Sequence, residues 1–326
     1  MAKLRLGIIG TGGIARGHIE RLSALPGVEI TAICDIKPDH MQRTVDRFPV
    51  LTEARRFEDH KELLAAGITD GVVICTPHTT HFEQIINSLA ASQHVLSEKP
   101  LVCNVKDAHE VLEAEKKSGK VLVLNYQRHY QPEFLFIRDA IASGTYGPVQ
   151  FVQGLQGQEW LKNCANSWRH DPALSGGGQL NDSGSHMLAV LLFVTGLSVA
   201  SVGAFIDNMT VPVDINSALS IKFVGGAQGN ISVVGNATRF HEDITIWCDR
   251  GIFFMRNGSL EVADEHGKLS KPTADELPSG SNPDVNFVNA IMHNEPIGSP
   301  AIWGLRVIEL TEAAWKSAEA GAIAKV

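Results

Sequence analysis

The sequence predicts an α/β protein with an amino-terminal doubly wound sheet and a carboxy-terminal α+β domain on a large, mostly antiparallel sheet. Up to about residue 125, continuous apolar runs alternate with helical segments, as a parallel sheet covered on both faces requires. Further along, short strands follow one another through glycine-containing turns, which is typical of antiparallel pairing. A chain of 326 residues also exceeds the size at which single cores stop growing, so two domains are expected.

The first half contains apolar runs of strand length with helical segments between most of them. The runs are "LRLGIIG" at 4–10, "VEITAICD" at 28–35, "GVVICTP" at 71–77, "HVLSEKP" at 94–100 and "KVLVLNYQ" at 120–127. Residues 81–92 and 105–119 have helical spacing, and the second segment ends at Gly119 after two lysines, a typical helix end. "LTEARRFED" at 51–59 is expected to add a short edge strand.

The second half begins with a helix at 131–144, a strand at 148–157 and a helix at 184–196. An antiparallel meander is then expected from strands at 199–206, 216–224, 229–237, 243–249 and 251–257. Helices around 284–294 and 301–320 close the chain, and residues 270–283 form a surface loop rich in Pro, Ser and Gly.

Composition excludes several classes of protein. The formal charge of −8 and the absence of a Lys/Arg run argue against a nucleic-acid partner. "MLAVLLFVTG" is about half the roughly 20 residues that span a bilayer, and glycines interrupt the apolar start "MAKLRLGIIG", so we expect no membrane partner and a cytoplasmic location. The scattered cysteines, never spaced C-x-x-C, predict neither a metal site nor a disulfide framework.

A glycine pattern follows the first strand. Gly10, Gly12 and Ala15 form G-x-G-x-x-A, in which the first glycine permits a tight turn, the second lets the backbone approach a pyrophosphate, and the alanine keeps helix and strand close. The helix amino terminus would then face the phosphates. The alternative is a plain strand-to-helix turn, because the pattern alone is weakly specific.

Asp35 strengthens the nucleotide-binding hypothesis. It ends the second strand and lies 20 residues beyond Ala15, the offset expected of a carboxylate that binds the adenosine ribose. Such a carboxylate repels a 2'-phosphate, so NAD is favoured over NADP, although Lys37 lies close enough to weaken that preference. The alternative is that Asp35 caps the following helix.

Lys99 ends the apolar run "HVLSEKP". In a doubly wound sheet, ligands bind outside the carboxyl ends of the strands, so we expect its ammonium to act as a local electrophile beside the nicotinamide, with Pro100 fixing the backbone. Glu98 is either its ion-pair partner or solvated. The alternative is an ordinary strand leaving the sheet for solvent.

Asp182 and His186 stand four residues apart at the head of a helix, after three glycines that permit close approach of backbone or substrate. One hypothesis makes His186 the acid/base group, with Asp182 holding its ring or binding substrate hydroxyls. The other makes Asp182 a helix cap and His186 a packed histidine.

These motifs together resemble the glucose-fructose oxidoreductase, inositol dehydrogenase and MocA family. The resemblance rests on Gly10 to Ala15, "EKP" at 98–100 and "GGG-x-L-x-D-x-G-x-H" at 176–186, and "NYQRHYQPEF", "GTYGPV" and "LRVIELTEAAWKSAEAG" extend it over nearly the whole chain. It implies a Rossmann domain at 1–124 and a substrate-binding and oligomerisation domain at 125–326. It also implies a homodimer or homotetramer that transfers hydride between NAD and a sugar, polyol or cyclitol.

By this similarity, Lys99, Asp182 and His186 are catalytic, and the Lys99–Pro100 peptide is cis in some relatives. The expected cofactor-binding residues are Gly10, Thr11, Gly12, Gly13, Ile14, Asp35, Thr76, Pro77, His81, Glu98 and Lys99. The expected substrate-binding residues are Lys99, Arg128, Trp168, Arg169, Asp182 and His186, and no metal is expected.

Some features depart from the family pattern or leave alternatives open. His78 stands where relatives often have asparagine, and no acidic residue directly follows His186. Arg128, His129, Trp168 and Arg169 have surface or packing explanations too; two arginines leave an acidic sugar possible. Alternative functions within the family are an NAD-dependent glycosidase acting through transient oxidation and a non-catalytic sensor of sugar or NAD.

Overall fold

The computed structural model describes residues 3–326, which form two compact units. Among the described residues, the first unit comprises 3–102, 106–127 and 281–304, and the second comprises 103–105, 128–280 and 305–326. The prediction placed a single boundary after residue 124, whereas residues 281–304 return to the first unit. No helix in the described range 3–326 is both long and apolar enough to cross a bilayer.

The first unit is a doubly wound sheet. Within residues 3–326, its strands follow the order β3-β2-β1-β4-β5-β6, and all of its pairings are parallel. Its elements are β1 (Leu4–Ile9), α1 (Ala15–Ser23), β2 (Val28–Cys34), α2 (Pro38–Arg47), β3 (Arg55–Phe57), α3 (His60–Ala65), β4 (Gly71–Ile74), α4 (His81–Ala90), β5 (His94–Ser97), α5 (Val105–Ser118), β6 (Leu122–Leu124) and α10 (Pro283–His293).

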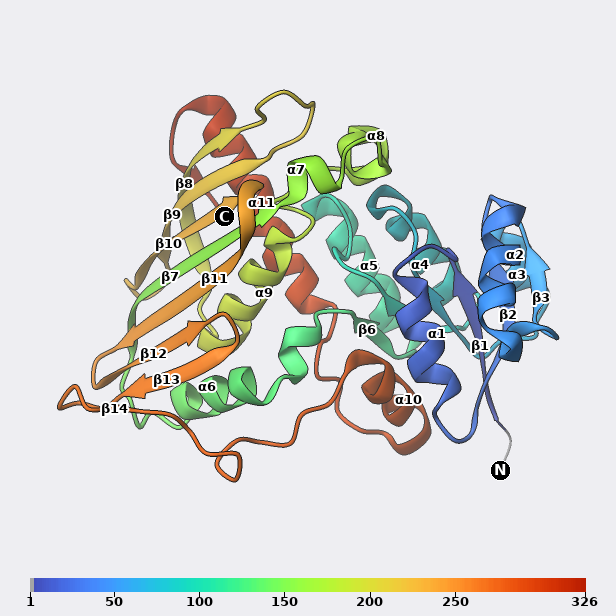
Figure 1. Ribbon diagram of the computed structural model, residues 1–326, viewed down its shortest axis with the longest axis horizontal. Coiled ribbons are helices and arrows are strands. Elements are labelled where there is room, and N and C mark those ends of the chain that lie inside the picture. The colour runs from blue at the N-terminus through green and yellow to red at the C-terminus, as the bar shows by residue number, and fades with distance from the viewer. Residues whose placement is uncertain (1–2) are drawn as a thin grey trace. The chain divides into compact units, whose positions relative to one another are not determined.

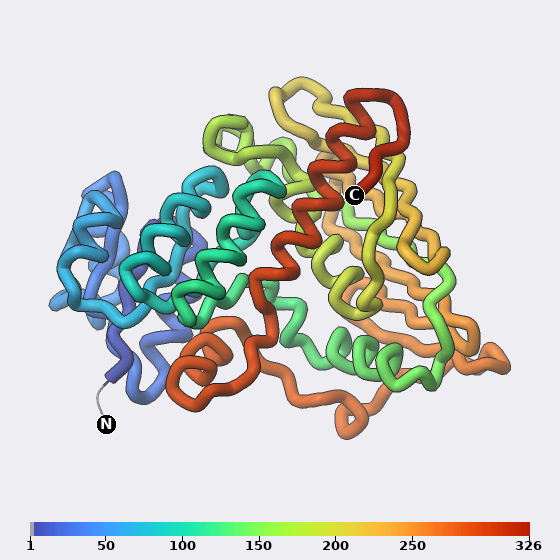
Figure 2. The backbone as a smooth tube through the Cα atoms, turned by 180° about the vertical axis from the view of Figure 1, so that it is seen from behind, coloured from blue at the N-terminus to red at the C-terminus, as the bar shows by residue number. Residues whose placement is uncertain are grey.

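Helices cover both faces of this sheet, as the continuous apolar strands require. Helices α1 and α10 lie on one face and α4 and α5 on the other, as the front and back views show (Figures 1 and 2). The core on the α1 side includes Leu6, Ile8 and Ile19, and α10 adds Phe287 to it. The predicted edge strand at 51–59 is β3, shortened to three residues.

The second unit is built on a large mixed sheet. In the part of the chain that is described, its strands follow the order β14-β13-β12-β11-β7-β10-β9-β8-β15. Its elements are α6 (Pro132–Ala142), β7 (Val149–Glu159), α7 (Trp160–Asn163), α8 (Pro172–Ser175), α9 (Gly184–Thr195), β8 (Val199–Asp207), β9 (Asn216–Phe223), β10 (Gln228–Val234), β11 (Asn236–Cys248), β12 (Gly251–Arg256), β13 (Ser259–Ala263), β14 (Leu269–Ser270), α11 (Ile302–Ala320) and β15 (Ala324–Lys325).

The predicted single meander is wrong in one respect. Strand β7 inserts between β10 and β11, pairs in parallel with β10 and antiparallel with β11, and so separates two meanders. The other pairings are antiparallel, which confirms the mostly antiparallel sheet. The strands expected at 229–237 and 243–249 are divided differently, because β11 runs unbroken from residue 236 to residue 248.

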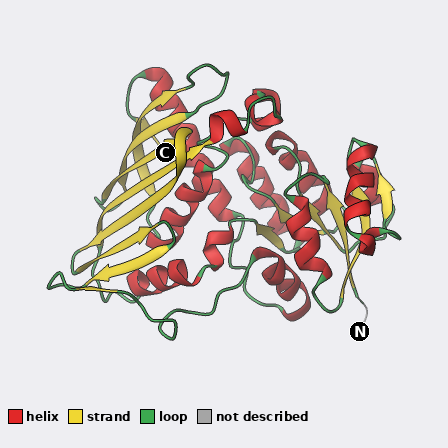
Figure 3. Ribbon diagram, viewed as in Figure 1, coloured by secondary structure: helices red, strands yellow, loops and turns green. Residues whose placement is uncertain are grey.

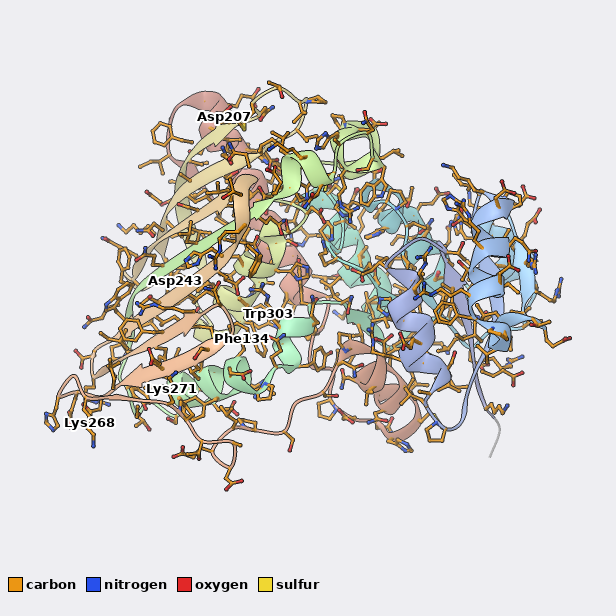
Figure 4. All side chains as sticks on the ribbon, in the orientation of Figure 1. Phe134, Asp207, Asp243, Lys268, Lys271 and Trp303 are labelled. Carbon is orange, nitrogen blue, oxygen red and sulfur yellow. The ribbon has the colours of Figure 1, made fainter. Side chains whose placement is uncertain are left out.

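Helices pack on one face of this sheet (Figure 3). On that face, Gly154 of β7 brings the sheet close to Met187 and Leu191 of α9. The opposite face carries polar and aromatic side chains. Asp243, labelled on the sheet in Figure 4, pairs with Arg256 of the neighbouring strand at 3.1 Å. The rings of Phe151 and Trp247 meet edge to face on adjacent strands of the same face, 5.6 Å apart.

Candidate active site

The glycine turn after β1 has the geometry that its sequence predicts. Gly10 has a φ of +87°, and a Cβ atom there would lie 2.8 Å from the Cys75 carbonyl carbon and oxygen, so only glycine fits. A Cβ atom at Gly12 or Gly13 would meet nothing within 4 Å. Helix α1 follows with Ile14 at its start, and no side chain within residues 3–326 caps this end. Its first N–H groups therefore suit an anionic ligand.

Asp35 lies directly after β2 and braces this turn. One carboxylate oxygen accepts the Thr11 backbone N–H at 2.9 Å and the Thr11 hydroxyl at 3.0 Å, and the other accepts the Lys37 N–H at 2.9 Å. Helix α2 begins after Lys37 without a side-chain cap, so the capping alternative for Asp35 is not observed. Each carboxylate oxygen has two lone pairs, so Oδ1, which accepts the Lys37 N–H, keeps one for a ribose hydroxyl.

Thr76 and Pro77 follow β4 at the same edge of the sheet. The Thr76 hydroxyl donates to Gln84 at 2.6 Å, and Thr80 donates to the Pro77 carbonyl at 2.7 Å. His81, the first residue of α4, is fully buried, with its two ring nitrogens 2.8 Å from the Pro100 carbonyl oxygen and 3.0 Å from that of Thr76. Its imidazole therefore contacts the backbone of two loops.

Lys99 follows β5, and its peptide bond to Pro100 is cis. Glu98 is 5% exposed, and its carboxylate accepts the Lys99 backbone N–H at 3.1 Å and the Asn125 amide at 2.6 Å. Of the alternatives for Glu98, solvation is therefore not observed. Because parallel strands end at one edge of a sheet, Lys99 lies at the same edge as the glycine turn and Asp35.

The second unit holds Asp182 in a cluster of side chains. Its carboxylate accepts the Trp160 indole N–H at 2.9 Å and pairs with the Arg169 Nε at 2.7 Å. The Arg169 guanidinium in turn lies 4.5 Å from the centre of the Trp168 ring. The structure thus brings together three residues predicted from the sequence and adds Trp160, which the sequence analysis missed.

His186 lies in the first turn of α9, and its backbone N–H bonds to the Ser183 carbonyl at 3.2 Å. The residue at the helix start is Ser183, without a side-chain cap bond, so Asp182 is not the helix cap of the alternative hypothesis.

Arg128 belongs to the same unit and forms a nearly buried ion pair with Glu242 of β11, with 2.5 Å between Nη1 and Oε2.

The glycines before Asp182 allow two backbone segments to pack closely together. A Cβ atom at Gly178 would lie 2.0 Å from the Asp214 carbonyl oxygen, so this position requires glycine. The Asp214 carboxylate accepts the N–H groups of Gly178 at 2.9 Å and Leu180 at 2.7 Å, and the Trp315 indole at 3.1 Å. These bonds shape the loop that carries Asp182. Neither Asp214 nor Trp315 has a local sequence signal that points to this loop.

The first unit therefore has the features of an NAD-binding Rossmann domain: an open glycine turn, an uncapped helix start and a carboxylate after the second strand. Family models agree with this class. Residues 4–126 match an oxidoreductase family with an NAD-binding Rossmann fold, and residues 134–254 match the GFO/IDH/MocA C-terminal domain. The chain belongs to the GFO/IDH/MocA family.

Curated relatives include the inositol 2-dehydrogenase of Salmonella paratyphi B, 32% identical over 153 residues, which are 46% of this chain and 45% of that protein. The D-glucoside 3-dehydrogenase of Escherichia coli is 29% identical over 206 residues, 62% of this chain and 57% of that protein. The matches thus span about half the length of these relatives. A solved levoglucosan dehydrogenase, in complex with NADH and L-sorbose, has a TM-score of 0.90 at 20% identity, covering 100% of this chain and 99% of that one.

Proposed function

We propose that this protein is an NAD-dependent dehydrogenase that oxidises a hydroxyl group of a sugar, polyol or cyclitol, or catalyses the reverse reduction. One observation carries the proposal: Lys99 lies at the carboxyl edge of the same sheet as the Gly10–Gly13 turn and Asp35. The names of the relatives support the substrate class, because inositol, glucosides and levoglucosan are polyhydroxylated rings.

In this proposal, the residues after the first two strands hold the cofactor. The backbone at Gly10 to Ile14 binds the pyrophosphate, Asp35 binds the adenosine ribose, and the loop of Thr76, Pro77 and His81 borders the cofactor with Glu98 and Lys99. NAD supplies the hydride acceptor. The carboxylate of Asp35 disfavours the 2'-phosphate of NADP by charge repulsion.

Lys99, Asp182 and His186 are the proposed catalytic groups. Oxidation of an alcohol releases a hydride and a proton, and His186 takes the proton as general base. The Lys99 ammonium stabilises the alkoxide charge that develops on the substrate oxygen. Asp182, oriented by Trp160 and Arg169, binds a substrate hydroxyl or the ring of His186. Arg128, Trp168 and Arg169 are proposed to contribute to substrate binding.

The test is a spectrophotometric assay of NADH formation across a panel of inositols, aldoses, glycosides and sugar acids. We expect NADH to form in proportion to at least one oxidised product. His186→Asn should lower kcat by about 10²- to 10⁴-fold, the usual contribution of a general base. His266→Asn is a matched control, because that side chain is 83% exposed, and it should leave kcat unchanged.

Two results would contradict the dehydrogenase. Hydrolysis of a glycoside without net NADH would identify a glycosidase acting through transient oxidation. NAD binding with no turnover of any substrate, unaffected by His186→Asn, would identify a non-catalytic sensor.

We also propose that the protein is a homodimer or homotetramer that associates through the helix-free face of the large sheet. The half-buried aromatic side chains of Phe151, Trp247 and Phe254 on that face support the proposal, since apolar surface left partly open to solvent is typical of association surfaces. Light scattering after gel filtration should give a multiple of 35.3 kDa. Trp247→Glu should shift the particle toward the monomer, and a monomeric wild-type protein would contradict this proposal.

A further inference from the structure

We propose that two buried histidines, His18 and His81, position Lys99 by fixing the backbone of the Glu98–Pro100 segment, His18 through the Glu98 carboxylate and His81 through the Pro100 carbonyl. The inference deepens the proposed function and rests on it. The residues that position Lys99, and so affect the reaction only through it, are Glu98, His18, Asp284 and His81.

Glu98 is the link between His18 and Lys99. One carboxylate oxygen accepts the Lys99 backbone N–H at 3.1 Å. The other accepts the Asn125 amide at 2.6 Å and lies 3.1 Å from Nε2 of His18. These contacts join the end of β5 to the end of β6 and to α1, the helix that starts at the glycine turn. The position of the Lys99 peptide is thereby coupled to the proposed cofactor site.

The contacts of His18 favour a positive charge, because each ring nitrogen faces a carboxylate. Its Nδ1 lies 2.6 Å from Oδ1 of Asp284, while Nε2 faces Glu98. Ionised carboxylates accept hydrogen bonds and carry negative charge, so they stabilise the imidazolium, in which both ring nitrogens donate. Arg21 also pairs with Asp284 at 2.5 Å. The two negative charges of this cluster, on Glu98 and Asp284, are therefore compensated by two positive charges, on His18 and Arg21.

The pKa values agree with that charge state. Burial alone would lower the pKa of His18, but its hydrogen bonds and charge interactions with Asp284 and Glu98 raise it to about 9. Burial alone would raise the pKa of Glu98, but the His18 contact lowers it to about 2, with further contributions from the Lys99 charge and Asn125. Around neutral pH, His18 and Glu98 are therefore both ionised.

His81 holds the other end of the segment and is neutral. Burial, together with a smaller effect of the neighbouring His78, lowers its pKa to about 4, because the uncharged carbonyls of Pro100 and Thr76 that its ring nitrogens face raise the pKa only weakly. A neutral imidazole has one N–H. The shorter contact, 2.8 Å to the Pro100 carbonyl, is the one we assign to it. The N–H of Lys99 and the carbonyl of Pro100 are thus held from two helices, α1 through His18 and α4 through His81.

The place of this charged cluster next to Lys99 indicates that it positions the lysine rather than stabilising the fold as a whole. Buried ion pairs are often no more stabilising than apolar packing of the same volume, because desolvation opposes the attraction. The same sheet has a simpler ion pair between Arg5 and Asp70, 2.6 Å apart and partly exposed, at the amino ends of β1 and β4. That pair lies at the edge opposite Lys99 and provides a matched control.

The kinetic test compares Glu98→Gln, His18→Gln and His81→Phe with Asp70→Asn. Misplacement of a reacting group by about 1 Å costs on the order of 100-fold in rate, so we expect the first three variants to lower kcat by about 10- to 100-fold. In His18→Gln, whose side chain is not a proposed cofactor contact, the dissociation constant of NAD and the KM of the alcohol should stay within about threefold. Asp70→Asn should lower the melting temperature and leave kcat unchanged. If kcat of His18→Gln and His81→Phe matched the wild type, the inference would be overturned.

His18→Gln leaves an unbalanced buried carboxylate and can impair folding. The double variant His18→Gln/Glu98→Gln removes the carboxylate that loses its partner, while Arg21 still pairs with Asp284, so it should melt at a higher temperature than His18→Gln alone. Its kcat should remain below that of the wild type, because an amide at position 98 holds the Lys99 N–H more weakly than an ionised carboxylate does. Full recovery of kcat together with stability would mean that the cluster acts on folding only, against the inference.

A spectroscopic test does not depend on activity. In protein labelled with ¹⁵N-histidine at neutral pH, we expect one doubly protonated buried ring that disappears in His18→Gln and one neutral buried ring that disappears in His81→Phe. A neutral His18 would overturn the inference. If the wild type oxidised no substrate in the panel, the proposed function would fail, while these ring states would still decide how the segment is held.

Discussion

Lys99 in the first unit and Asp182 in the second are held by different kinds of contact. Beneath Lys99, the charges of His18, Glu98 and Asp284 are almost completely buried and fix the backbone. At Asp182, an indole and an arginine with a 35% exposed side chain hold the carboxylate itself. Buried charges are weakly screened by salt and exposed ones strongly. The first unit therefore positions its functional residue through the main chain, and the second unit does so through the side chain.

The largest effect is expected at Lys99 itself. Lys99→Ala should lower kcat by about 10³-fold, because it removes the charge that stabilises the developing alkoxide. The dissociation constant of NAD, measured by fluorescence titration, should rise much less, by at most about tenfold, because the Gly10–Gly13 turn and Asp35 make the main proposed cofactor contacts. Lys106→Ala is the control, since Lys106 is 84% exposed. If NAD affinity fell by the same factor as kcat, Lys99 would act mainly in cofactor binding. Its proposed role in stabilising the alkoxide would then be wrong.

A smaller effect is expected in the second unit. Asp182→Asn keeps the shape of the side chain but removes the charge that pairs with Arg169, and we expect kcat to fall by about 100-fold. Because the Arg169 contact is partly exposed, Arg169→Gln should cost less, about 10-fold in kcat/KM. Steady-state kinetics with the best substrate of the panel would measure both. If Arg169→Gln were the more harmful change, substrate binding to Arg169 would outweigh its contact with Asp182.

The buried cluster should also make stability depend on pH. The folded-state pKa of His18, about 9, lies above its ordinary value of 6.5, so its contribution is complete below pH 6.5 and is lost as pH rises through about 9. His18 faces Glu98, Asp284 and Arg21. Between pH 7 and pH 10, the wild type should lose about 2 kcal/mol more of its free energy of unfolding than His18→Gln does. Parallel curves in urea denaturation would contradict a charged His18.

The smallest effect is expected at Asp35, the residue of the first unit that is proposed to bind the adenosine ribose. Asp35→Ser should weaken NAD binding about 10-fold and reduce the discrimination against NADP, since one charged hydrogen-bond acceptor is lost. Calorimetric titration with both cofactors would measure this, with Asp39→Ser on α2 as the control. Unchanged NAD affinity would restrict Asp35 to bracing Thr11.

The parallel sheet was predictable because its strands are buried on both faces and read as continuous apolar runs. The strand segment at 238–242 was not recognised, because "TRFHE" is polar and mostly exposed, and pairing with β7 extends β11 through it. Short elements such as α3 and β13 to β15 carry too few residues for a periodic pattern. The parallel pairing of β7 with β10 joins segments about 80 residues apart and has no local signal.

The candidate site was predictable where a motif is local. The glycine turn, Asp35, Lys99 and the Asp182/His186 pair all stand in short patterns. Their supporting contacts are not local: His18 meets Asp284 across 266 positions, and Trp160 meets Asp182 across 22. A buried histidine or tryptophan has the same appearance in sequence whether it packs in a core or orients a functional carboxylate.

The return of residues 281–304 to the first unit has a consequence for biosynthesis. Phe287 of α10 fills the core beside α1, and Asp284 supplies a counter-charge for His18. While the ribosome is still making the large sheet, the nucleotide-binding half therefore lacks part of its interior and keeps an uncompensated cation. A gene fragment that stops after residue 127 should yield an incomplete, aggregation-prone product, whereas adding residues 281–304 through a flexible linker should restore a foldable module.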